Sequence, residues 1–162
     1  MPLTFRAISE ERPGPKWARL FAEYWPAYSR WWAREGLAPR PTYMESRRAI
    51  SRHMPEIAGL YDALCDLAGG GDMAARFLSF YCPPRYLAGC SQAVWSGDAP
   101  LLVRNYDYDH RAFDAVVLHT RWLGRAVMGT SDGLFGLVDG VNDAGLAVSL
   151  TFGGRREVGE GF

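Results

Sequence analysis

The sequence predicts an α+β fold in which a helical region precedes an antiparallel β region, and the spacing of apolar residues leads to this prediction. Up to residue 82 apolar side chains recur every three or four positions, which is the helical period. After the segment Cys82-Pro83-Pro84 the period falls to two, which is typical of strands. With 162 residues, of which 48% are hydrophobic and 22% charged, the chain is expected to fold as a compact protein.

Helices are expected over residues 5–84. Pro26 is expected to kink or divide the first helix, because proline removes a backbone hydrogen bond. Thr42 and Glu45 match the capping box of a second helix, and Pro55 opens a third. Three glycines end the third helix, and Asp72 is expected to cap a fourth. The apolar stripe of the first helix comprises Trp17, Leu20, Phe21, Tyr24, Tyr28, Trp31 and Trp32.

Strands are expected at 90–96, 101–106, 114–121, 124–130, 134–140 and 145–152. Turn residues separate several of them: Ser96-Gly97-Asp98, Gly124 and Asn142-Asp143-Ala144-Gly145. The C-terminal region is therefore predicted to be an antiparallel meander.

Charge and cysteine content exclude several function classes. The 18 Lys and Arg residues balance the 18 Asp and Glu residues, which argues against a nucleic-acid binder. No apolar run approaches the roughly 18 residues of a membrane span, and no secretory signal is recognisable. Three cysteines without a CxxC pair favour neither a disulfide framework nor a zinc site. We therefore expect a cytoplasmic protein with no metal and no cofactor.

The segment around Gly89 and Cys90 is the most informative part of the sequence. Cys90 directly follows a glycine at the start of a predicted hairpin, and the partner strand is expected to return Asn105 and Asp107 beside it. Because side chains alternate along a strand, these two share one face, and Arg104 points to the other unless a bulge at the strand end redirects it.

This placement suggests nucleophilic chemistry. A thiol is a weak nucleophile until it is deprotonated, and no histidine is adjacent to Cys90. If the Gly89–Cys90 bond were cut, Cys90 would carry its own base, because a free α-amine has a reference pKa of about 7.7–8.0. Gly89 tolerates a strained backbone, which would help the thiol attack its own preceding carbonyl.

Three stretches carry a family resemblance: Gly89-Cys90, Arg104-Asn105-Tyr106-Asp107, and the run from Asp139 to Val148, DGVNDAGLAV. Together they resemble the N-terminal-nucleophile (Ntn) hydrolases. Among these they are most similar to the acyl-CoA:6-aminopenicillanic acid acyltransferase family, a relative of the choloylglycine hydrolases. The resemblance covers residues 85–154. It implies an αββα-type fold, an all-helical propeptide in residues 1–89, and a catalytic part in residues 90–162.

The resemblance also implies residue roles. Cys90 would be the nucleophile, with its α-amine as base after autocatalytic cleavage of the precursor, or zymogen, at Gly89–Cys90. Asp107 would orient the amine, Arg104 would favour the thiolate, and Asn105 lies between the two. Thr151 stands near the position that supplies an oxyanion donor in relatives.

The implied activity is that of a cysteine-dependent hydrolase or acyltransferase acting on linear amide or thioester bonds. The partner would be a small acyl substrate, an acyl-CoA or N-acyl amino compound, and the propeptide would pack on the catalytic part. The sequence leaves a homo-oligomer open. Family members continue beyond this point, so the chain is expected to be truncated. A non-catalytic fragment or a protein-interaction module therefore remains the alternative.

Other residues have simpler interpretations. Cys65 is expected in the core, and Cys82 in a buried linker. A papain-like Cys-His pair is disfavoured, because papain-type nucleophiles begin a helix and Cys90 leads into a strand pattern. Asp139 and Asn142 are interpreted mainly as turn formers.

Overall fold

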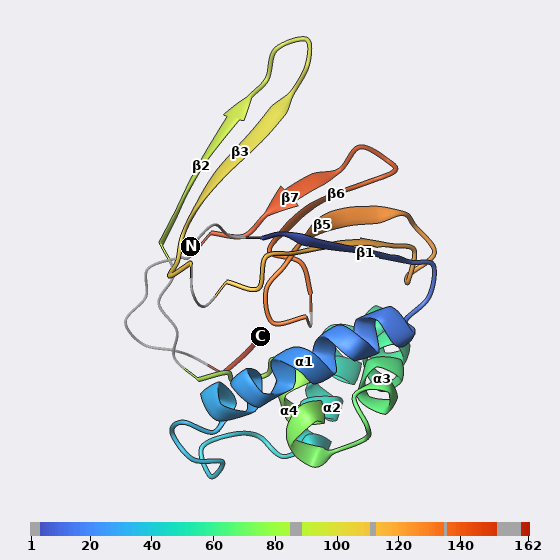
Figure 1. The fold of residues 1–162 in the computed structure, drawn as a ribbon, viewed down its shortest axis with the longest axis vertical. Helices are drawn as coiled ribbons and strands as arrows, with labels where there is room; N and C mark the ends of the chain where they lie inside the picture. Colours follow the sequence, from blue (N-terminus) through green and yellow to red (C-terminus); the bar gives the residue numbers. More distant parts are fainter. Residues whose placement is uncertain (1–3, 85–88, 111–112, 135, 152–159) are drawn as a thin grey trace.

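The computed structural model describes residues 4–84, 89–110, 113–134, 136–151 and 160–162. Helices and strands both occur within these ranges, which confirms the α+β class (Figure 1). The strands are β1 (Arg6–Glu10), β2 (Gly89–Trp95), β3 (Leu101–Asp107), β4 (Val116–Thr120), β5 (Val127–Ser131), β6 (Asp139–Asn142) and β7 (Ala147–Ser149). The helices are α1 (Pro15–Trp32), α2 (Tyr43–His53), α3 (Ala58–Leu67) and α4 (Asp72–Ser79), and a 3-10 turn (Pro55–Ile57) precedes α3.

A five-stranded sheet has the order β1-β4-β5-β6-β7. Its last four strands form an antiparallel meander, as predicted, but the first two predicted strands, 90–96 and 101–106, are not part of it. The expectation that residues 1–89 are all helical is wrong at its start, because β1 joins this sheet parallel to β4, with Arg6 opposite Val116. The strand is short, and its pairing partner lies far along the chain, so local periodicity carries no clear signal for it.

The four helices cover one face of this sheet (Figure 1). The core between the layers is mainly aromatic, and Trp17, Trp32 and Phe77 are almost fully buried in it. Val116 supplies a buried side chain from the sheet. The Trp17 indole Nε1 donates a hydrogen bond to the backbone oxygen of Leu134 at 3.1 Å, so the buried ring keeps its polar atom paired.

Helix boundaries follow the predicted signals with two exceptions. Thr42 and Glu45 form the full capping box of α2, as predicted. Helix α1 runs through Pro26 without dividing. Aromatic packing on both sides of Pro26 explains its continuity, because Trp25 and Tyr28 both contact Phe77 of α4. The N-cap of α4 is Gly71, so the prediction that Asp72 is the cap was wrong.

The strand predictions are least accurate between β5 and β7. Of the expected strand 134–140, residues 134 and 136–138 lie outside β6 and residue 135 is outside the described residues; Gly133 and Leu134 adopt positive φ values of 85° and 58° and turn the chain. The expected strand 145–152 is shorter in the structure, ending at Ser149, and residue 152 lies outside the described residues. The turn before β7 is confirmed, since the Asn142 side chain accepts hydrogen bonds from two following backbone amides.

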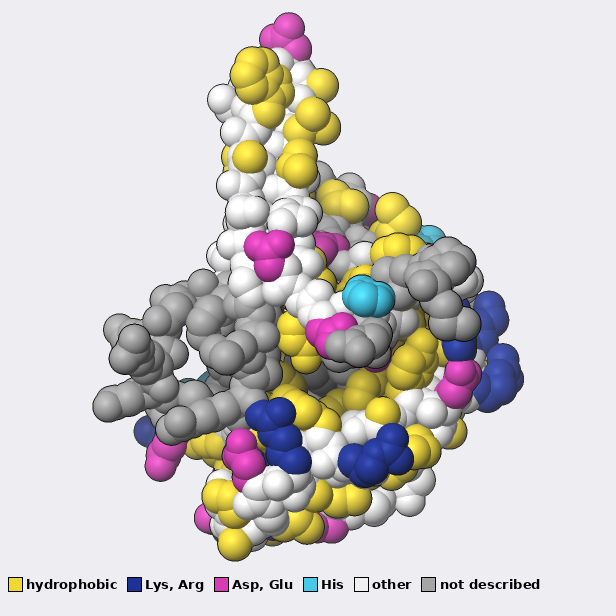
Figure 2. Space-filling model, turned by 60° about the vertical axis from the view of Figure 1, so that its left-hand side comes forward, with side chains coloured by type: hydrophobic (Ala, Val, Ile, Leu, Met, Phe, Trp, Pro, Cys, Tyr) yellow, Lys and Arg dark blue, Asp and Glu magenta, His cyan; other side chains and the backbone are white. Residues whose placement is uncertain are grey.

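Strands β2 and β3 form a separate two-stranded sheet, a hairpin that projects from the molecule (Figure 1). The hairpin itself and its Ser96–Asp98 turn agree with the prediction. Figure 2 shows apolar side chains exposed along this projection. They include Val94, Trp95, Leu101 and Val103. Within the described ranges, none of the helices has the length and apolar character needed to cross a membrane.

Candidate active site

The register of the hairpin determines which side chains surround Cys90. Cys90 pairs with Tyr106, and Gly89 pairs with Asp107. Directly opposed residues of an antiparallel pair project from the same face, so Cys90 shares its face with Tyr106 and Arg104. Asn105 and Asp107 project from the opposite face. The hairpin returns Asn105 and Asp107 beside Cys90 along the backbone, as predicted, although their side chains lie on the face opposite the Cys90 side chain. The predicted separation from Arg104 also agrees with the register.

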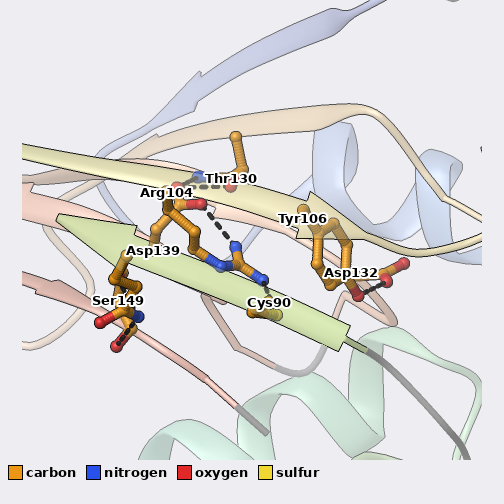
Figure 3. A network of polar contacts seen from close by, with 8 residues as sticks. Cys90, Arg104, Tyr106, Thr130, Asp132, Asp139 and Ser149 are labelled. Carbon is orange, nitrogen blue, oxygen red and sulfur yellow. Dashed lines mark hydrogen bonds and ion pairs between the residues drawn. The ribbon is translucent and has the colours of Figure 1, made fainter.

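Arg104 is the cationic group next to the Cys90 sulfur (Figure 3). Its Nη2 donates to Cys90 Sγ at 3.6 Å, and its Nη1 donates to Asp139 Oδ2 at 2.8 Å. The guanidinium also lies over the Tyr106 ring, 4.2 Å from its centroid. Burial alone would lower the pKa of Arg104, but its hydrogen bonds to Cys90 and Asp139 outweigh this effect and raise the pKa above its usual value. Arg104 is thus a fixed, buried cation at the thiol.

A row of polar residues on the face of the five-stranded sheet away from the helices, its outer face, contacts the hairpin. Thr130 of β5 lies opposite Asp139 of β6, and Asp139 lies opposite Ser149 of β7. Asp139 binds Arg104. The Gln92 side-chain amide donates to the hydroxyl of Ser149 and, at 3.1 Å, to the backbone oxygen of Ser149. The interpretation of Asp139 as mainly a turn former is wrong, because it lies in a strand and pairs with the Arg104 side chain. No local pattern links these strand positions, which come together only in the folded sheet.

Asp107 lies beside the Gly89–Cys90 peptide bond. A Cβ atom placed on Gly89 would stand 3.2 Å from Asp107 Cβ and 3.7 Å from its Oδ2, so a glycine fits this close approach best. Asn105 donates through its side-chain amide to the other Asp107 oxygen. Gly89 lies within β2 and is not among the positive-φ glycines. Gly89 therefore does not adopt the left-handed conformation that would indicate the strained backbone expected there.

A chain of half-buried polar contacts leads from Tyr106 toward helix α1. The Tyr106 hydroxyl donates to Asp132 Oδ2 at 2.7 Å, and the backbone N–H of Asp114 donates to the other Asp132 oxygen at 3.4 Å. Asp114 in turn accepts from the Tyr28 hydroxyl. Burial raises the pKa of Asp132, and burial raises the pKa of Asp114 to about 6, with the nearby Asp132 charge adding to it. None of these four residues is assigned to the site from the sequence: Tyr28 is expected only in the apolar stripe of the first helix, and Tyr106 only within a family stretch.

The remaining predicted residues lie apart from this network. Thr151 is exposed just after β7, and it is Ser149 that contacts the hairpin from this segment. Cys65 is buried on α3, where burial raises the pKa of its thiol to about 11. Cys82 is half-buried beyond α4. Among the described residues no cluster of three or more His, Cys, Asp or Glu side chains is arranged to hold a metal ion.

The comparisons with known proteins agree with the family resemblance. The family model described as acyl-coenzyme A:6-aminopenicillanic acid acyl-transferase matches residues 94–162. No curated protein and no solved structure matches the chain. The matched region includes Arg104, Asn105, Asp107 and Thr151 and begins four residues after Cys90. The resemblance predicted from the sequence is confirmed over this region.

Proposed function

We propose that the chain is an Ntn-type, self-processing amidohydrolase or acyltransferase with Cys90 as its nucleophile. The observation that carries the proposal is the contact between Arg104 Nη2 and Cys90 Sγ at 3.6 Å. A neighbouring guanidinium favours the thiolate over the thiol. The proposal is also supported by the family match, which includes Arg104.

The proposed first reaction is cleavage of the Gly89–Cys90 peptide bond. The Cys90 sulfur attacks the Gly89 carbonyl carbon, a C–S bond forms, and the C–N bond breaks as the departing amine takes up a proton. Water then hydrolyses the resulting thioester, which yields the Gly89 carboxylate, the free Cys90 thiol and its α-amine. The close approach of Asp107 to Gly89, opposite which it pairs, supports a role for this carboxylate next to the new amine.

In turnover, the α-amine of Cys90 would accept the thiol proton and the sulfur would attack a substrate carbonyl. The leaving amine or thiol would take the proton, and an acyl-thioester on Cys90 would form. Water would release the acid, whereas an amine acceptor would give a new amide. Asp107, held by Asn105, would orient the α-amine. The oxyanion donor is assigned to Thr151 by resemblance alone.

The proposed substrates are linear amides or acyl thioesters, of the acyl-CoA or N-acyl amino type. The helices would act as the propeptide, and the hairpin would belong to the second layer of an αββα arrangement. Two features support this arrangement: the helices cover one face of the five-stranded sheet, and the hairpin contacts residues of its outer face.

The test is the intact mass of the purified chain under denaturing conditions. We expect two species, residues 1–89 and residues 90–162, and amino-terminal sequencing should begin at Cys90. Cys90→Ala should stay uncut. Cys90→Ser should be cut slowly, because a hydroxyl makes the same acyl shift less readily.

Cys65→Ala is the matched control, because Cys65 is buried on α3 away from the hairpin; it should be cut like the wild type. The exposed apolar hairpin also fits the alternative of an interaction module. A chain that stays uncut, and whose Cys90 is no more reactive toward an electrophile than Cys82, would favour that alternative and contradict the enzyme assignment.

A further inference from the structure

We propose that Asp139 is a positioning residue that holds the Arg104 guanidinium against the Cys90 sulfur, with Thr130 in turn holding the Asp139 carboxylate. The inference rests on the proposed role of Cys90 as nucleophile. It adds a member of the site that local sequence reasoning assigned to a turn.

The two carboxylate oxygens of Asp139 have different partners. Oδ1 accepts from the Thr130 hydroxyl at 2.5 Å and from the Thr130 backbone N–H at 3.3 Å. Oδ2 accepts from Arg104 Nη1 at 2.8 Å. Because Thr130 and Asp139 are directly opposed in neighbouring strands, the carboxylate plane is set by the sheet. The orientation is therefore supplied by a rigid element.

The guanidinium then transmits that orientation to the thiol. Its two terminal nitrogens are in a fixed planar fork, and one binds Asp139 while the other binds Cys90. The Arg104 side chain is only 6% exposed, whereas that of Asp139 is 34% exposed. A buried cation that lost its carboxylate partner would be free to turn toward other acceptors or solvent. Asp139 thus acts on Cys90 through Arg104.

This ion pair also joins two separate sheets. Arg104 belongs to the projecting hairpin, and Asp139 belongs to the five-stranded sheet. The hairpin makes a second polar contact with that sheet through Gln92 and Ser149. Loss of the Asp139 charge should therefore change the position of Arg104 more than it changes the folding of the sheet.

The test measures how fast Cys90 reacts with iodoacetamide as a function of pH, with peptide mass spectrometry separating Cys90 from Cys65 and Cys82. Cut and uncut chains give different Cys90 peptides, so each form is followed separately. For Asp139→Asn we expect the rate near neutral pH to fall by roughly tenfold, within the range of coupling between contacting charged residues. The difference should disappear at alkaline pH, where thiols ionise without a cationic neighbour. Asp139→Glu should recover part of the rate.

A double-mutant cycle separates positioning from a general structural role. In an Arg104→Gln background, Asp139→Asn should have no further effect on the alkylation rate, because its route to Cys90 is already removed. Asp143→Asn is the matched control. Asp143 also pairs with an arginine, Arg125 at 3.0 Å, but at the turn between β6 and β7, and its loss should leave the Cys90 profile unchanged.

Thr130→Val provides an independent variant if Asp139→Asn fails to fold. It keeps the carboxylate and removes one of its hydrogen bonds, so the rate should fall in the same direction by a smaller factor. An unchanged Cys90 profile in folded Asp139→Asn, or in Thr130→Val when the first variant is unfolded, would overturn the inference. Self-cleavage at Gly89–Cys90 in those same variants would leave the proposed function standing, so the two failures are distinguishable.

Discussion

The helical layer and the β2–β3 hairpin are held in place by different forces. The helices bury a stacked aromatic cluster, in which Phe77 is 1% exposed and Trp17 is fully buried. The hairpin instead leaves Trp95 67% exposed, and it contacts the five-stranded sheet through polar side chains. The candidate nucleophile therefore lies on the element with the less apolar support. Directional hydrogen bonds are suited to such an element, because they fix orientation with little buried area.

The largest loss of stability is expected from a cavity in the helical layer. Phe77→Ala should lower the free energy of unfolding by about 3–5 kcal/mol, because the ring is fully buried among aromatic neighbours from α1. Chemical denaturation of the purified chain measures this change. Phe77→Leu, which leaves a smaller cavity, is the control and should cost less. A cost below 1 kcal/mol for Phe77→Ala would show that the aromatic cluster is not the stabilising core.

A pH-dependent prediction concerns Asp114, which lies between the two regions. Its pKa of about 6 is raised by burial above the usual value for aspartate, so the folded state retains a proton that the unfolded state has lost. Stability from this group is therefore complete below about pH 4 and decreases as pH rises toward about 6. The expected loss is on the order of 2–3 kcal/mol. Asp114→Asn should remove this dependence.

The measurement is the difference in unfolding free energy between the wild type and Asp114→Asn at several pH values. Asp143→Asn is the control with the opposite sign. Its backbone hydrogen bond from Ala126 and its arginine partners lower the pKa of Asp143, so the stability it contributes is lost as pH falls. A wild-type minus Asp114→Asn difference that does not change between about pH 4 and pH 7 would contradict the Asp114 prediction.

The two regions also differ in how well the sequence predicts them. The capping box at Thr42, the turn at Asn142 and the meander of β4 to β7 are local features, and the residues themselves specify them. Strand β1 was missed because its pairing with β4 is remote in sequence. The family stretches include Cys90 and Arg104. The contacts that Asp139, Thr130 and Asp132 make around them depend on separate strands coming together in the fold.

The next prediction tests the polar attachment of the hairpin. Tyr106→Phe keeps the ring beneath Arg104 but removes the hydroxyl that donates to Asp132. Because a half-buried acceptor loses its partner, we expect a cost of about 1–2 kcal/mol in unfolding free energy. Hydrogen exchange of the hairpin amides should quicken relative to those of α1. Tyr108→Phe, whose ring stacks on Tyr106 at 5.5 Å, is the control and should change little.

A smaller effect is expected within the helical layer itself. Thr42→Ala removes the side chain that accepts from Glu45 N at the start of α2, and should cost about 1 kcal/mol. Thr42→Ser keeps the acceptor and should restore most of the stability. Thermal unfolding provides the measurement, and the Cys90 alkylation rate should be the same in both variants. A change in that rate would show that the helical layer and the hairpin are coupled through more than the contacts described.

The smallest effect is expected at the end of the hairpin, where apolar area is largely in solvent. Trp95→Ser should change the free energy of unfolding by less than about 0.5 kcal/mol, because a mostly exposed side chain away from the core contributes little to folding. Trp17→Ser, on the buried face of α1, should by contrast be severely destabilising. A loss above about 1 kcal/mol for Trp95→Ser would mean that another surface covers this face of the hairpin in solution. An indole contributes that much to the free energy of unfolding only when it is removed from water. The hairpin would then depend on apolar packing as the helices do, and the contrast between the two regions would no longer hold.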